Sequence, residues 1–196
     1  MTTLLLAEFV PEEGKVLVVG AGGGLELGVF AKAQPGWRFA GVDPSAEMLK
    51  LAVATLGSLA SRVDFVEGYI DAAPPGPFDG ATCLLTLHFL TADERLRTLG
   101  EVRRRLKPGA PLIVAHHSFP QSGHEKTRWL DRYAAFAVSS GIPTSNMRNA
   151  IDAIGARLPL LSPEQDVVLL QKAGFKDIEL FYAGFTFKGW VAYAPA

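Results

Sequence analysis

Three glycines at alternate positions follow a short apolar run near the start of the chain. Gly20, Gly22 and Gly24 have the spacing G-x-G-x-G and come directly after the run VLVV. Because glycine has no side chain, such a turn lets backbone amides and a following helix N-terminus approach a polar ligand closely. Glycine-rich turns also occur for purely structural reasons, and phosphate-binding folds use a related G-x-G-x-x-G pattern. The turn therefore predicts a ligand site without naming the ligand.

Asp43 is the second residue that could bind a ligand. It follows the next apolar run, residues 37–42, about 20 residues after the glycine turn, at the expected carboxyl edge of a parallel sheet. A carboxylate at this edge can accept both hydroxyl hydrogens of a ribose. The alternative is that Asp43 caps the following helix, but Ser45 is already available for that capping. We therefore favour the ribose role.

The elements that would position these residues alternate between short apolar runs and segments of helical periodicity. This alternation predicts an α/β fold with a doubly wound sheet and helices on both faces. The link Ala183-Gly184 is so short that the last two strands must pair antiparallel, so the sheet is mixed. The seven expected strands are residues 15–19, 37–42, 62–66, 78–85, 111–116, 178–182 and 185–192.

Length, charge and cysteine content limit the function further. The 196 residues predict one domain, 1–196. The net charge of −1 provides no large basic surface, so we expect a small-molecule substrate and no nucleic acid. No apolar stretch is long enough to span a membrane, and the single Cys83 favours a reducing cytoplasm. The sequence leaves both a monomer and a homodimer open.

Five segments, in their usual order and spacing, resemble the class I S-adenosylmethionine-dependent methyltransferases. They are VLVVGAGGG, GVDPSAEML, FVEGYID, FDGATCLLTLHFL and LKPGAPLIVAHHS. The resemblance covers nearly the whole chain and implies a Rossmann-like methyltransferase fold, S-adenosyl-L-methionine as cofactor and a small-molecule methyl acceptor. In this family the glycine turn meets the methionine part, the acid after the second strand takes the ribose, and the loop after the third strand holds adenine. The residues implied for the cofactor are Gly20, Ala21, Gly22, Gly24, Asp43, Pro44, Met48, Gly68, Tyr69, Ile70, Asp71, Thr86 and Leu87.

Two positions depart from the family pattern. The family often carries an acid two residues before the first glycine, where this chain has Val18, and an Asp where this chain has Tyr69. The first change would remove a contact or water bridge to the methionine amino group. The second removes an acceptor for the adenine amino group, although Asp71 is close enough to replace it and Tyr69 could stack on the ring.

His88 is the best candidate for a general base and a substrate contact. It follows the fourth strand, beside the expected position of the reacting methyl group, and a neutral imidazole accepts a proton near pH 7. The alternative is a packing histidine. Methyl transfer from a sulfonium depends mainly on alignment, so the chemistry does not demand a base. His116 and His117 should point to opposite faces of the fifth strand, and we expect no metal site.

The last third of the chain also resembles the carboxy-S-adenosylmethionine synthases, a family of this fold that makes a carboxylated cofactor. The matching segments are SNMR at 145–148 and LLQKAGF at 169–175. The resemblance implies that Arg148 binds the extra carboxylate, and the alternative is a surface arginine on an ordinary helix. We expect residues 118–160 to be a helical insertion that forms part of the substrate pocket, with some of the aromatic residues after position 128 in its wall.

Two rival functions share parts of this pattern. A nicotinamide-dependent (NAD) oxidoreductase would use the same turn and Asp43, but its G-x-G-x-x-G pattern requires a glycine where this chain has Leu25. A non-catalytic partner protein that has kept the fold would explain Val18 and Tyr69. We prefer the methyltransferase interpretation.

Overall fold

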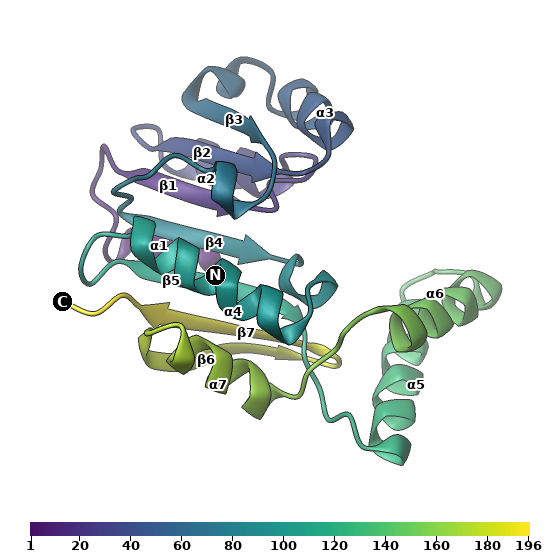
Figure 1. The fold of residues 1–196 in the computed structure, drawn as a ribbon. Coiled ribbons are helices and arrows are strands. Elements are labelled where there is room, and N and C mark those ends of the chain that lie inside the picture. Colours follow the sequence, from purple (N-terminus) through teal and green to yellow (C-terminus); the bar gives the residue numbers. More distant parts are fainter.

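A computed structural model describes residues 1–196, except for the side chains of residues 145, 146, 148 and 149. Its seven strands form one sheet in the order β3-β2-β1-β4-β5-β7-β6 (Figure 1). Strands β1 to β5 are parallel, and β7 lies antiparallel between β5 and β6, which confirms the predicted mixed sheet. The strands are β1 Lys15–Val19, β2 Arg38–Asp43, β3 Val63–Glu67, β4 Gly80–Leu84, β5 Pro111–His117, β6 Lys176–Gly184 and β7 Phe187–Tyr193.

Helices cover both faces of the sheet because the central strands are apolar on both faces. Along β1, Val16 and Val18 pack in one buried cluster with α1, α2 and α3, while Leu17 and Val19 pack in a second cluster with α4 and α7. The helices are α1 Thr2–Ala7, α2 Leu25–Ala33, α3 Ala46–Leu56, α4 Ala92–Arg105, α5 Gly123–Ser139, α6 Thr144–Arg157 and α7 Pro163–Lys172. Three 3-10 turns accompany them, η1 Gly57–Arg62, η2 Ile70–Ala72 and η3 Leu87–Phe89.

Several expected strand ends differ from the structure by one or two residues, and two of these differences have a local cause. The fourth strand stops at Leu84 because Leu85 adopts a left-handed conformation with φ of 56°, and Phe78 forms only an isolated bridge to Leu106. The last two strands turn at Phe185 and Thr186 instead of at residues 183–184. The antiparallel pairing follows from the shortness of the link in either position.

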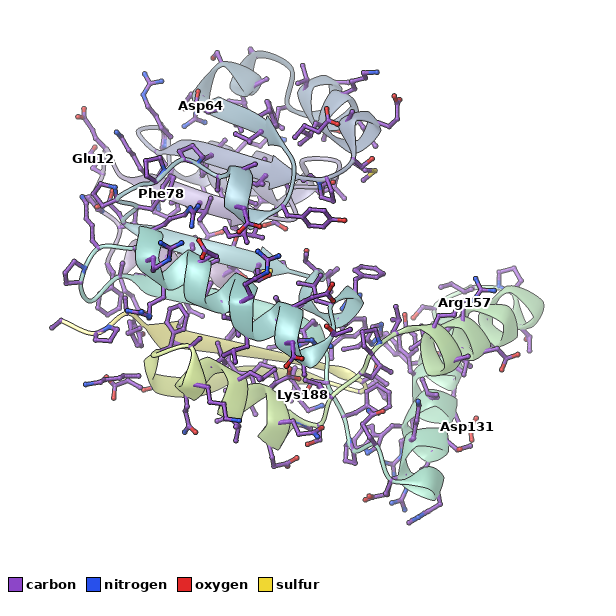
Figure 2. All side chains as sticks on the ribbon, in the orientation of Figure 1. Glu12, Asp64, Phe78, Asp131, Arg157 and Lys188 are labelled. Carbon is purple, nitrogen blue, oxygen red and sulfur yellow. The ribbon has the colours of Figure 1, made fainter. Side chains whose placement is uncertain are left out.

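The insertion at 118–160 forms two helices, α5 and α6, that pack on each other and stand away from the sheet (Figure 1). A small apolar cluster of Phe119, Leu130 and Leu160 anchors them. Asp131 of α5 and Arg157 of α6 lie on this projecting hairpin (Figure 2).

A buried ion pair joins helices α4 and α7, which cover the same face of the sheet. Arg95 of α4 is fully buried and donates to Asp166 Oδ1 of α7 at 2.7 Å, to Leu90 O and to Pro159 O. The other carboxylate oxygen of Asp166 lies 3.2 Å from His116 Nε2. Burial alone would raise the pKa of Asp166, but His116 and Arg95 together hold that pKa below its usual value.

Candidate functional site

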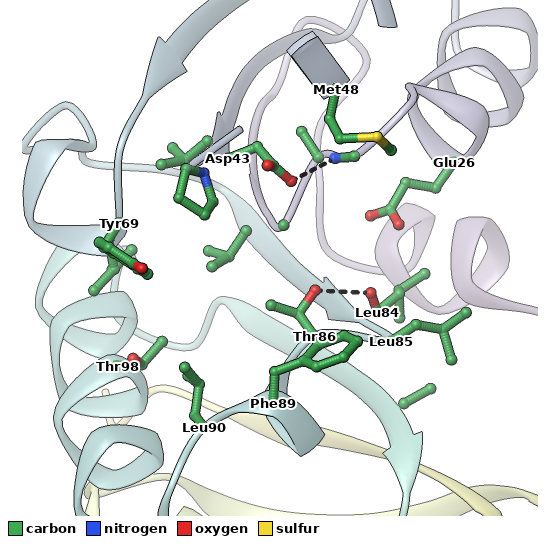
Figure 3. Close-up of a pocket in the computed structure, with 18 of the residues that line it drawn as sticks. Glu26, Asp43, Met48, Tyr69, Leu84, Leu85, Thr86, Phe89, Leu90 and Thr98 are labelled. Atoms are coloured by element: carbon green, nitrogen blue, oxygen red, sulfur yellow. Dashed lines mark hydrogen bonds between the residues drawn. The ribbon is translucent and has the colours of Figure 1, made fainter. Parts of the chain in front are cut away.

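A cavity of about 1110 Å³ opens at the carboxyl ends of β1, β2 and β4 (Figure 3). The chain crosses from β3 on one side of β1 back to β4 on the other, so this is the point at which the strand order reverses. Open α/β sheets bind ligands in such a crevice, since the loops that follow neighbouring strands diverge there. The cavity is where the glycine turn and Asp43 were expected to meet.

The glycine turn forms one wall of the cavity. Gly20 N and Ala21 N both donate to Val42 O, which fixes the turn against β2, and a Cβ on Gly20 would collide with Thr86. At Gly22, with φ of 49°, an added Cβ would lie in van der Waals contact with Met48 Cε at 3.7 Å, and Gly22 itself lines the cavity. Gly24 is not part of the lining: it is the N-cap of α2 and packs against Leu56.

Asp43 links the glycine turn to the start of α3. Its Oδ2 accepts from Gly22 N at 2.9 Å and its Oδ1 accepts from Ser45 N at 2.9 Å. The N-cap of α3 is Ser45, whose hydroxyl accepts from Met48 N, so capping is not the role of Asp43. Each carboxylate oxygen can accept more than one hydrogen bond, so both retain capacity for a ligand hydroxyl. Pro44 and Met48 line the cavity next to it.

The loop after β3 forms the opposite wall. Gly68, Tyr69 and Ile70 line the cavity, and the Tyr69 side chain is 62% exposed, so its ring is available for stacking. Asp71 is absent from the lining. Its carboxylate lies 2.5 Å from Arg97, which holds the pKa of Asp71 below its usual value. The structure therefore engages Asp71 with Arg97 and does not place it as a replacement acceptor in the cavity.

The segment after β4 divides its residues between the cavity and the core. Leu85, Thr86 and Phe89 line the cavity, whereas Leu87 and His88 are buried behind it and are absent from the lining. The cause is the turn η3, which carries residues 87 and 88 inward. The order of residues in the sequence does not show which of them line the cavity and which are buried.

His88 is thus in a packed environment instead of an open one. Its Nδ1 accepts a hydrogen bond from His117 N at 3.4 Å, and its ring lies against Phe89. Burial lowers the pKa of His88 to about 3, so the ring is neutral at neutral pH. The structure does not bring His88 to the cavity as a base or a substrate contact.

The histidines that end β5 point to opposite faces, as predicted. His116 packs on Trp190 beside Asp166, and His117 stacks on Phe187 with its Nδ1 3.0 Å from Thr186 Oγ1. Neither lines the cavity. Among the described residues, no three His, Cys, Asp or Glu side chains gather as metal ligands would. No helix in the described part of the chain combines the length and apolarity needed to cross a membrane.

Several lining residues were not marked by any sequence motif. Glu26, Thr98 and Thr2 reach the cavity because helices α2, α4 and α1 pack around the strand ends. The only signal for the aromatic residues of β6 was the concentration of aromatic side chains near the C-terminus. Of that group, Phe181 and Tyr182 line the cavity.

The α5–α6 hairpin contributes no described side chain to this cavity. Lys188 of β7 lies 5.3 Å from the centroid of the Trp129 ring, which links the hairpin to the turn after β6. Arg148 belongs to α6, and its side chain lies outside the described residues.

Comparison with known proteins identifies the family. The sequence family described as methyltransferase domain matches residues 16–109, the segment that carries the glycine turn, Asp43, the loop after β3 and the turn after β4. Residues 16–109 therefore match a methyltransferase domain, and the fold of the chain is that of the class I S-adenosylmethionine-dependent methyltransferases. The dinucleotide-binding pattern G-x-G-x-x-G would also require a glycine at position 25, where this chain has Leu25. The family match and this residue both disfavour the oxidoreductase alternative.

Relatives of this methyltransferase domain extend over almost the whole chain. A carboxy-S-adenosyl-L-methionine synthase from Campylobacter jejuni is 23% identical over 194 residues, which cover 96% of this chain and 80% of the relative. A crystal structure of a putative O-methyltransferase from Nostoc punctiforme superposes with a TM-score of 0.72 at 21% identity over 98% of this chain. Human N-acetylserotonin methyltransferase, solved with its cofactor S-adenosylmethionine, gives a TM-score of 0.68 at 18% identity over 100% of this chain.

The two solved structures are longer than this chain, which spans 54% of the first and 50% of the second. At these identities they show that the methyltransferase fold is shared. The sheet order and the C-terminal antiparallel pair are part of that shared fold.

Proposed function

We propose that this protein is a methyltransferase that transfers a methyl group from S-adenosyl-L-methionine to a small-molecule acceptor. The observation that carries the proposal is the joint position of the glycine turn, Asp43 and Tyr69 around one cavity at the strand-order reversal. The family match covers these same three features.

The residues present fit the cofactor. Figure 3 shows Asp43 between Glu26 on one side of the cavity and Tyr69 on the other. The cofactor has its ribose between an amino-acid part and an adenine, so the carboxylate in the middle would accept the ribose hydroxyls. Tyr69, with Leu90 and Thr98, would flank the adenine. Gly22 leaves open backbone where a side chain would otherwise stand.

The cavity also has room for an acceptor. Its volume of about 1110 Å³ exceeds the roughly 300–1,000 Å³ of an ordinary small-ligand pocket. The bound cofactor supplies an activated methyl group on a positively charged sulfur. Leu85, Phe89 and Phe181 form an apolar part of the wall that would align a small, largely apolar acceptor and exclude water.

A second function is favoured by one observation. The carboxy-S-adenosyl-L-methionine synthase of Campylobacter jejuni aligns with nearly the full length of this chain, not only with the cofactor-binding part. A synthase-like activity would need a group that binds the added carboxylate, and Arg148 is the candidate for it.

Mass spectrometry of the bound nucleoside separates these functions. The protein is incubated with S-adenosylmethionine, freed of excess ligand by gel filtration, and analysed next to a sample as purified. A methyltransferase is expected to carry S-adenosylmethionine or S-adenosylhomocysteine in both samples. A carboxylated cofactor in the purified sample would favour the synthase-like activity, and no nucleoside after incubation at millimolar concentration would contradict both.

A further inference from the structure

Glu26 is an acid in the cavity wall whose hydrogen-bonding capacity is mostly unused. It lies in the first turn of α2, and its Oε1 accepts one hydrogen bond, from Thr82 Oγ1 at 3.0 Å. The other two described acids of the lining have other partners, and Asp43 is also the residue proposed to bind the ribose. Asp43 accepts two backbone amides, and Glu94 forms the capping box of α4 with Thr91.

The register of β1 with β4, together with the hydrogen bond from Thr82 to Glu26, relates the position of Glu26 to that of Val18. Val18 of β1 is paired with Thr82 of β4, and paired residues of neighbouring strands point to the same face. Helix α2 packs on this face, in the same buried cluster as Val18. Glu26 reaches from α2 to Thr82 and so brings a carboxyl group beside the position where the family pattern has its acid.

The surroundings of Glu26 suit a positively charged ligand. The side chain lies beside the glycine turn, on the far side of Asp43 from Tyr69 (Figure 3). Burial raises the pKa of Glu26 to about 8, because few polar groups replace the water that a charged carboxylate would lose. A cation in contact with the carboxyl group would favour its charged form and offset this effect.

We infer that Glu26 binds the ammonium group of the amino-acid part of S-adenosylmethionine and replaces the acid that is absent at Val18. This inference rests on the proposed function, because it assumes that the cofactor occupies the cavity with its adenine at Tyr69. The ammonium group then donates to the free lone pairs of the Glu26 carboxylate, while Thr82 Oγ1 donates to Glu26 Oε1.

The first test compares two ligands that differ in the amino-acid part. S-adenosylhomocysteine carries the ammonium group, and 5′-methylthioadenosine has the same adenosine and sulfur without it. Both are titrated by calorimetry into the native protein, Glu26→Gln and the control Glu47→Gln. Glu47 is also an acid in the first turn of a helix, but it pairs with Lys50 on the surface.

We expect Glu26→Gln to weaken S-adenosylhomocysteine by about tenfold or more, since a charge-assisted hydrogen bond is lost. Its affinity for 5′-methylthioadenosine should stay within about twofold, because this ligand lacks the ammonium group that Glu26 would contact, and changes that remove no contact usually alter the free energy little. Normal binding of the second ligand also shows that the variant is folded. Glu47→Gln should bind both ligands as the native protein does.

The second test measures protons. In the free protein at pH 7 the Glu26 carboxyl group is mostly protonated, since its pKa is about 8. Contact with an ammonium group lowers that pKa, so S-adenosylhomocysteine should release close to one proton and bind more tightly as the pH rises from 6 to 8. Titration in buffers with different ionisation enthalpies measures the release. Glu26→Gln, and the native protein with 5′-methylthioadenosine, should release none.

Three results would overturn the inference while leaving the proposed function in place. Unchanged affinity of Glu26→Gln for S-adenosylhomocysteine would remove Glu26 from the ammonium site. An equal loss for both ligands would show that Glu26 only shapes the cavity. Proton release that persists in Glu26→Gln would assign the titration to another group. If the native protein binds neither ligand, the proposed function fails as well, and the inference fails with it.

Discussion

Asp43 combines a structural contact with the expected contact to the cofactor. Its carboxylate holds Gly22 N and Ser45 N, and it faces the cavity between the two walls. Asp43→Ala should therefore reduce affinity for S-adenosylhomocysteine at least tenfold, because charge-assisted hydrogen bonds contribute about 1.5 to 3 kcal/mol each. Asp43→Asn keeps the shape and one acceptor oxygen and should lose less.

Calorimetry measures both affinities, and thermal unfolding checks that each Asp43 variant is folded. A folded Asp43→Ala protein with an unchanged dissociation constant would restrict Asp43 to holding the glycine turn.

Ligand binding by Arg148 variants tests which of the two proposed functions the protein performs. If its guanidinium binds a carboxylate, the planar fork matters and lysine is a poor replacement. Arg148→Lys and Arg148→Ala should then bind S-adenosylhomocysteine normally and carboxy-S-adenosyl-L-methionine weakly, with a loss of roughly 2 kcal/mol or more for alanine when the pair is buried. Titration of both ligands measures this. Equal affinities of all three proteins for each ligand would return Arg148 to the surface of α6.

Some residues of the candidate site could be predicted from the sequence and others could not. The positions of Asp43 and Gly22 in the cavity wall were predictable because Asp43 ends β2 and Gly22 lies in the turn directly after β1. Glu26 was not, because its position depends on the register of β1 with β4 and on the packing of α2. His88 lies outside the cavity lining for a local reason: it belongs to the 3-10 turn η3, which begins two residues after Leu85, and it is buried there.

The buried ion pair between α4 and α7 should be sensitive to mutation. Asp166→Asn leaves Arg95 buried beside a neutral partner, which should lower the free energy of unfolding by about 3 to 5 kcal/mol. Urea unfolding at pH 7 measures this loss. The double variant Arg95→Met with Asp166→Leu should recover much of it, and Glu47→Gln on the surface should change little.

The same ion pair predicts a pH dependence. The pKa of Asp166 is lower in the folded protein, so its contribution is present above the unfolded pKa of roughly 3.9 and is lost as the pH falls through the folded value. The native protein should lose this part of its stability in acid, and Asp166→Asn should not. An identical acid dependence of the two proteins would contradict the assignment.

Elements were predicted best where local chemistry marks their ends. Ser162 and Gln165 form the capping box that begins α7, and Pro163 occupies the first helical position. The end of β4 and the last turn were displaced because Leu85 and Phe185 adopt left-handed conformations that apolar residues rarely take. The insertion was correctly predicted as helical, and its part in the substrate pocket stays a prediction.

At the scale of the whole molecule, the strand order creates the site. The reversal between β1 and β4 separates the loops that follow them, and the cavity lies in that gap. Apolar runs alone predicted a doubly wound sheet but not the order of its strands, because pairing between distant strands leaves no local mark in the sequence. The family resemblance implied the fold to which that order belongs.

Calorimetric titration of the native protein with S-adenosylhomocysteine and, separately, with NAD separates a methyltransferase from an oxidoreductase. We expect one equivalent of S-adenosylhomocysteine to bind per chain and no measurable binding of NAD, because the glycine turn has Leu25 where a pyrophosphate-binding turn needs glycine. Preferential binding of NAD, or no binding of S-adenosylhomocysteine at millimolar concentration, would contradict the proposed function.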